Sequence, residues 1–140
     1  MIIPILKGIQ TLYRSSNNLK SVIPGGIHYE RVFQQASFPY ATISIAPVSR
    51  ERTSGKTRIE VYEINIRVFS GPTAVDVEAI ERVLESLDRS PLPPLLSIPR
   101  HRVIDFRLSQ PAVIDEDDDT RLSQDVLIIN QTFELVVQYA

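Results

Sequence analysis

The two histidines, His28 and His101, are the side chains best suited to acid–base chemistry, because an imidazole titrates near neutral pH. Both stand beside residues typical of turns, and neither belongs to an HExxH motif or a histidine pair. The chain has no cysteine, which excludes a thiolate nucleophile and a cysteine-based zinc site. We therefore interpret both histidines as surface residues and expect no catalytic or metal site around them.

The strongest run of like charge could in principle bind a divalent cation. It comprises Asp115, Glu116, Asp117, Asp118 and Asp119. A calcium loop, however, spaces its oxygen ligands alternately, turns at a glycine and ends on a distant glutamate. This run has none of these features. We expect a solvated loop tip, with a charged contact to a partner as the alternative.

A second polar stretch, residues 49–58, is mostly basic. Its cations are Arg50, Arg52, Lys56 and Arg58. It lacks the interleaved aromatic residues on which single-stranded nucleic acid stacks. The formal net charge of −2 also makes the whole chain a poor ligand for nucleic acid. We expect a solvated hairpin loop, and we keep both charged stretches as candidate interface residues.

Nothing in the chain predicts a bound cofactor. The turn Pro24-Gly25-Gly26 matches neither the P-loop GxxxxGK[ST] nor the dinucleotide-binding GxGxxG. The serines at 15, 16 and 90 have no nucleophile-elbow context. The chain therefore lacks the sequence features of the common catalytic classes, and we expect its function to depend on surfaces and partners.

Two helices are predicted from apolar residues spaced three and four apart. The first runs from Ile2 to a stop within Ser15–Asn18, with Pro4 in its first turn. The second runs from Thr73 to Leu87, where Thr73 is the expected N-cap and Asp76 stands at the reach-back position of a capping box. Its apolar stripe is Val77, Ile80, Val83, Leu84 and Leu87.

Strands are predicted where apolar and polar residues alternate. A short strand is expected over residues 27–32, and a second over 41–46, closed by Pro47. A long strand follows over 59–69, with Tyr62, Ile64, Ile66 and Val68 on one face. The polar loop between the last two strands predicts a long hairpin.

A proline-rich connector, residues 90–99, separates the second helix from the final strands. We interpret it as a rigid loop packed by Leu92, Leu95 and Leu96, with a partner-binding polyproline segment as the alternative. Two strands then complete the chain, over 103–114 and 125–140. The first has Ile104, Phe106 and Leu108 on one face and a bulge or edge at Pro111. The second has one apolar face, at Leu127, Ile129, Phe133, Leu135, Val137 and Tyr139.

This order predicts an α+β fold with a mostly antiparallel β-sheet, two main α-helices packed on one face and a long hairpin loop. The 140 residues fit a single domain, 1–140. The opening segment MIIPILKGIQTLYR has Lys7 inside its apolar stretch and lacks the basic start of a secretory signal. No run approaches the roughly 20 apolar residues that cross a bilayer. We expect a protein made in the cytoplasm, with its N-terminus retained and no membrane partner.

Four stretches in order span most of the chain. They are the opening helix IIPILKGIQTLYR, the segment GGIHYERVFQQASFPYATISI, the strand-to-helix step YEINIRVFSG–TAVDVEAIERVLESL, and the late strands ending in FELVVQYA. Together they resemble the tail completion, or tail terminator, proteins of long-tailed bacteriophages and related prophages. The proline-rich connector and the acidic run are not part of this resemblance.

The resemblance implies a structural virion protein, not an enzyme. Members of this family look like small α+β protomers that form a homo-hexameric ring at the head-proximal end of the tail tube. The implied partners are other copies of the chain, the tail tube protein and a head-side connector or stopper, with DNA passing through the lumen without specific binding. Two alternatives stay open: a head-closure or neck protein of the same particle, and a cytosolic enzyme subunit whose site a partner completes.

Overall fold

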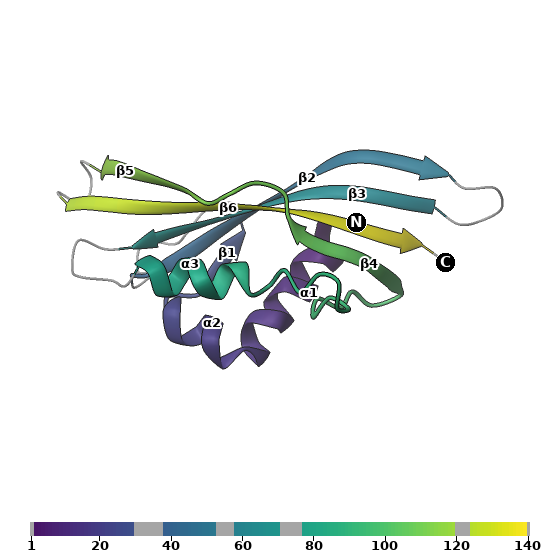
Figure 1. Cartoon of the computed structure of the whole chain (residues 1–140), viewed down its shortest axis with the longest axis horizontal. Helices are drawn as coiled ribbons and strands as arrows, with labels where there is room; N and C mark the ends of the chain where they lie inside the picture. Colours follow the sequence, from purple (N-terminus) through teal and green to yellow (C-terminus); the bar gives the residue numbers. More distant parts are fainter. Residues whose placement is uncertain (1, 30–37, 53–57, 71–76, 120–123, 140) are drawn as a thin grey trace.

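The computed structural model describes residues 2–29, 38–52, 58–70, 77–119 and 124–139. They form an α+β fold in which one long, mostly antiparallel sheet has all its helices on one face, as predicted (Figure 1). The six strands are β1 (Ile27–Tyr29), β2 (Tyr40–Arg52), β3 (Arg58–Ser70), β4 (His101–Leu108), β5 (Val113–Asp119) and β6 (Gln124–Tyr139). The predicted strand over 27–32 therefore begins as expected, and its remainder lies outside the described residues.

The strand order is β1-β2-β3-β6-β4, and β5 also pairs with β6. β1 and β2 are parallel, whereas the other pairs are antiparallel. The predicted hairpin is confirmed as β2 and β3, which stay paired from Tyr40 opposite Phe69 to Arg52 opposite Arg58. β6 is the centre of the sheet, because β3 lies on one side of it while β4 and β5 share the other.

The helices are α1 (Ile2–Ser15), α2 (Asn17–Val22) and α3 (Val77–Glu85). α1 confirms the first prediction. α2 was not predicted, because the polar stretch after α1 was interpreted only as the end of a helix. In the structure Ser16 is the N-cap of α2, and its hydroxyl accepts a hydrogen bond from the Leu19 N–H at 3.2 Å. The predicted start of the later helix, Thr73 to Asp76, lies outside the described residues.

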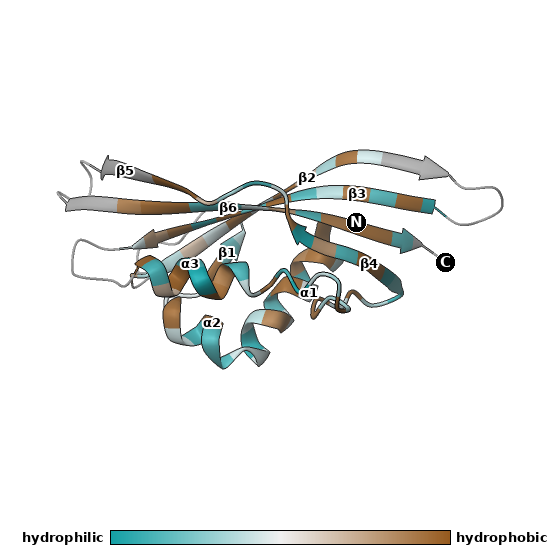
Figure 2. Ribbon diagram, in the orientation of Figure 1, coloured by the Kyte–Doolittle hydropathy of each residue, from teal (hydrophilic) through white to brown (hydrophobic). Residues whose placement is uncertain are grey.

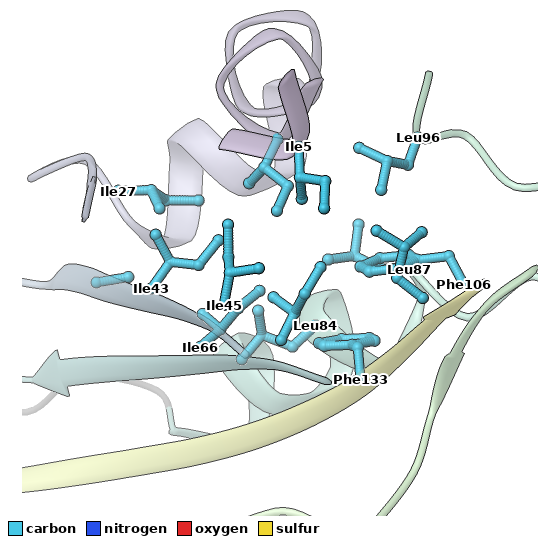
Figure 3. Packing of buried hydrophobic residues seen from close by; sticks show 14 of the residues in the cluster. Ile5, Ile27, Ile43, Ile45, Ile66, Leu84, Leu87, Leu96, Phe106 and Phe133 are labelled. Carbon is cyan, nitrogen blue, oxygen red and sulfur yellow. The ribbon is translucent and has the colours of Figure 1, made fainter. Parts of the chain in front are cut away.

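The core lies between the helices and the sheet. All four apolar residues predicted on one face of β3 are buried, and Figure 2 shows the matching alternation of hydropathy along that strand. Ile5 of α1, Leu84 of α3 and Phe133 of β6 meet in one cluster with them (Figure 3). Phe106 stacks on Phe133 with ring centroids 4.8 Å apart. The apolar face of the strands and the apolar stripe of α3 therefore face each other, as predicted.

Two β-bulges correct the predicted strands. Pro47 does not close β2, because the strand continues to Arg52 with a register shift between Pro47 and Ser49. Edge strands and bulges are the places where a strand tolerates proline. In β4 a second shift between Val103 and Asp105 leaves Ile104 unpaired and 42% exposed. An extra residue reverses the alternation, so Val103 takes the inward position predicted for Ile104.

The predicted loop at Asp115–Asp119 is wrong. These residues belong to β5, which pairs antiparallel with β6 from Val113 opposite Asn130 to Asp119 opposite Gln124. The predicted strand over 103–114 is in turn two strands, β4 and β5, with Pro111 between them. Strand pairing uses backbone groups, so a long partner can hold a sequence whose side-chain charge suggests a solvated loop.

The proline-rich connector is a loop, as predicted, but its packing residues differ. Leu96 and Ile98 are buried, whereas Leu92 and Leu95 are exposed. The loop passes so close to α1 that a Cβ added at Gly8 would lie 2.7 Å from the Ser97 carbonyl oxygen. Gly8 therefore permits the contact that holds the connector against the helix layer.

Candidate functional site

The two charged stretches lie at opposite ends of the sheet (Figure 1). Arg50, Arg52 and Arg58 belong to the β2–β3 end, where Arg58 is opposite Tyr139. The acidic residues Asp115, Glu116, Asp117, Asp118 and Asp119 lie at the other end, where Asp119 is opposite Gln124. Positions 124 to 139 of β6 correspond to about 50 Å at roughly 3.3 Å per residue. The two stretches therefore do not meet within one chain, and Lys56 lies outside the described residues.

Arg58 differs from the solvated cation that the sequence predicts. Its Nε lies 3.4 Å from Oε1 of Glu60, and the Glu60 side chain is only 2% exposed. The Tyr62 hydroxyl donates a hydrogen bond to Oε2 of the same carboxylate at 2.5 Å. A buried carboxylate needs such partners, because transferring a charge out of water is costly. Arg58 therefore helps to hold the loop end of the β2–β3 hairpin.

A second ionic group lies on the sheet face opposite the helices. Arg107 of β4 donates to Glu134 of β6 at 2.9 Å, and its Nε lies 3.5 Å from Asp105. Further along the same face, the Asn65 amide donates to the Thr132 hydroxyl at 3.1 Å. The Arg107–Glu134 ion pair is exposed and contributes little stability. Together with the partly buried Asn65–Thr132 hydrogen bond, it gives this face a polar surface.

Aromatic rings gather on the same open face near the start of β2. Tyr40 stacks between Phe38 and Phe69, with ring centroids 5.2 and 5.1 Å away, and the His28 ring approaches Tyr40 edge-on at 6.5 Å. The Arg67 guanidinium lies 5.5 Å from the Phe69 centroid. Sequence reasoning missed this cluster, because the register that places Tyr40 opposite Phe69 exists only in the folded hairpin.

The two histidines are not brought together. Nε2 of His28 lies 2.9 Å from the Gly25 carbonyl oxygen, and Nδ1 of His101 lies 2.7 Å from that of Pro99. Both side chains are half-buried, where the sequence predicted surface positions. Across the described ranges, no three histidine or acidic side chains gather in a way that could hold a metal ion. The contacts of both rings are those of turn-stabilising residues.

Asp88 joins the end of α3 to the end of β4. Its carboxylate accepts hydrogen bonds from the backbone N–H groups of Ser90 and Leu108, both at 3.0 Å. The Ser90 N–H holds the pKa of Asp88 below its ordinary value, and the Leu108 N–H and the Arg107 charge act in the same direction against the effect of burial. This link was not predicted, since it needs two segments that meet only in the tertiary structure.

Two open hollows border the helix layer and the connector. One, of about 490 Å³, lies between α1, α2 and α3 and is lined by uncharged residues that include Leu12, Val83 and Leu95. The other, of about 590 Å³, lies between the connector and β4, with Arg102, Asp105 and Arg107 in its wall. Neither of these hollows is lined by a histidine.

The chain matches the family model described as Tail completion protein gp17 over residues 7–133. It belongs to this family. The tail completion protein therefore has a structural role in bacteriophage tail completion and is a component of the phage tail. The resemblance of the four sequence stretches is confirmed, and it extends over most of the chain.

The remaining comparisons add little to this assignment. No curated protein matches the chain. Among solved structures, a protein without a functional name is similar with a TM-score of 0.43 and 13% identity, over 92% of this chain and 88% of its own. In the described part of the tail completion protein, no helix is both long and apolar enough to cross a bilayer.

Proposed function

We propose that this tail completion protein is the tail terminator of its particle. It forms a homo-hexameric ring that caps the head-proximal end of the tail tube and joins the tail to a head-side connector. Its partners are other copies of itself, the tube protein and the connector, and it performs no catalysis. The observation that carries this proposal is the family match over residues 7–133, which supports a role in finishing the tail.

The placement of charge is consistent with a ring. A closed ring of more than two copies needs head-to-tail contacts, in which two different surfaces of the chain meet. One end of the sheet carries Arg50, Arg52 and Arg58, and the other carries Asp115 to Asp119. Lys56 belongs to the same basic stretch of the sequence. These ends have opposite charge and lie far apart on one sheet, so each is available to a neighbouring copy.

Such a ring would surround the path of the DNA. The chain carries a formal net charge of −2, so the ring as a whole does not attract phosphate. Acidic side chains at the lumen would repel the phosphates of the DNA and prevent the DNA from adhering, whereas basic side chains would retain it. This supports passage of DNA without specific binding.

Electron microscopy of the assembled particle tests the proposal. We expect density for this chain at the head–tail junction with six-fold symmetry, and particles made without it should show heads separated from tails. Density on the head side of the junction with another symmetry would instead indicate a head-closure or neck protein. Absence of the chain from the junction would exclude the terminator role.

A further inference from the structure

β2 has an unpaired outer edge over much of its length. β1 covers this edge only at Ala41, Thr42 and Ile43, although β2 continues to Arg52. Among the described residues, no other strand pairs with β2 on this side. This free part of β2, residues 44–52, is called the arm. Its end extends past the helix layer (Figure 1), and Val48 at its bulge is 60% exposed. Such an edge presents backbone donors and acceptors that can accept an added strand.

β5 has the matching property at the other end of the sheet (Figure 1), on the opposite edge in the strand order. One of its edges pairs with β6, and no described strand pairs with the other. Val113 is 52% exposed and Ile114 is 49% exposed, so apolar side chains on both faces of this short strand face solvent.

The charges of the two edges determine which pairings are favourable. The arm contributes Arg50 and Arg52 with one acid, Glu51, whereas β5 contributes five acidic residues. Two copies of the arm repel each other, as do two copies of β5, and this repulsion prevents like edges from pairing. The basic arm of one copy attracts the acidic β5 of another copy. This attraction favours a head-to-tail contact, in which two different surfaces meet.

The strand directions fit such a contact. β2 and β6 both run antiparallel to β3 and are therefore parallel to each other, while β5 runs antiparallel to β6. β5 is consequently antiparallel to β2. A neighbouring copy in nearly the same orientation would present its β5 antiparallel to the arm, which is the arrangement of a regular antiparallel ladder.

We propose that the ring closes by strand addition, in which β5 of each copy pairs antiparallel with the β2 arm of the next copy. The occupant of each free edge is thus a second copy of this chain. This inference rests on the proposed ring and specifies the contact that would build it. With Asp117 opposite Arg50, an antiparallel ladder would place Asp115 opposite Arg52 and Asp119 opposite Val48 at each such contact.

Cross-linking in assembled tails tests this contact, and the absence of native cysteine makes it selective. The double variant Val48→Cys/Asp119→Cys, treated with a short bis-maleimide, should yield covalent multimers up to the full ring. Each single variant should yield at least tenfold less. The matched control is Ile3→Cys/Asp119→Cys, because Ile3 is 65% exposed but lies on α1, and it should yield no more than the single variants. If Asp119→Cys lowers the unfolding midpoint, Asp118→Cys replaces it.

The outcomes separate the contact from the proposed function. Six-fold density at the junction with no more cross-linking than in the control would overturn the strand contact and leave the terminator role intact. Dimers from Val48→Cys alone, or cross-links to the tube protein, would overturn it as well. Head-to-tail multimers in particles that lack this chain at the junction would support the contact and exclude the terminator role.

Discussion

The centre of the sheet and its two ends obey different constraints. At the centre, each strand places its apolar side chains under the helices, and residues such as Ile64, Leu84 and Phe133 are fully buried. At the ends, the β2–β3 hairpin and the β5–β6 pair extend beyond the helices and carry most of the clustered charge. Burial stabilises the centre, whereas the ends keep their extended form through backbone pairing along β3 and β6. Changes at the centre should therefore alter folding, and changes at the ends should alter assembly.

The largest expected effect is on folding. Leu84→Ala removes a fully buried side chain from the helix–sheet cluster, so it should lower the free energy of unfolding by about 2–5 kcal/mol. Urea denaturation measures this loss. The exposed Leu92 provides a control, since Leu92→Ala should change stability by less than about 0.5 kcal/mol. An unchanged midpoint for Leu84→Ala would contradict the packing of α3 on the sheet.

Gly8→Ala tests whether the connector is held against α1. Alanine favours a helix over glycine by about 1 kcal/mol, so the substitution would stabilise an isolated helix. Here the new Cβ would lie 2.7 Å from the Ser97 carbonyl oxygen, and we expect a net loss of about 1–3 kcal/mol. Thr11→Ala, at an exposed position of α1, is the control in the same denaturation experiment. A stabilised Gly8→Ala variant would show that the connector moves away at little cost.

Asp88 links stability to pH. Its pKa is lower in the folded chain than its ordinary value of 3.8, so the link is fully present above that value and is lost as pH falls through the folded pKa. Asp88→Asn should cost about 1–2 kcal/mol at neutral pH, since it removes charge-assisted hydrogen bonds. The unfolding midpoint of the variant should also fall less steeply in acid. Glu85→Gln, an exposed neighbour, should retain the wild-type profile.

Neutralising the acidic end should have the smallest effect on folding. Acidic residues 115–119 replaced by their amides should change the free energy of unfolding by less than about 1 kcal/mol, because β5 pairs with β6 through backbone groups that stay in place and single charges contribute little. Assembly on tail tubes should weaken at low salt and less so at high salt, where charge is screened. Ring occupancy by electron microscopy at two salt concentrations measures this. A salt-independent loss would exclude an electrostatic role for this end.

The candidate site was predicted only as two charged stretches. The residue types and spacing identified Arg50, Arg52, Lys56, Arg58 and the acidic run, but charge alone could not distinguish a loop from a strand. Arg58 shows the limit most clearly, because its pairing with the buried Glu60 depends on how the end of β3 packs. The aromatic cluster around Tyr40 likewise needs the β2–β3 register, which no local pattern contains.

The sequence by itself determined the α+β class, α1, the β2–β3 hairpin and the buried face of β3, because local periodicity decides which side chains can be buried together. Only the tertiary structure decided the bulges at Val48 and Ile104 and the placement of the acidic run in β5. A bulge is a mismatch between two strands, and an edge strand forms when a partner offers its backbone. Both are properties of pairs of segments distant in the chain, so neither has a signature in one segment alone.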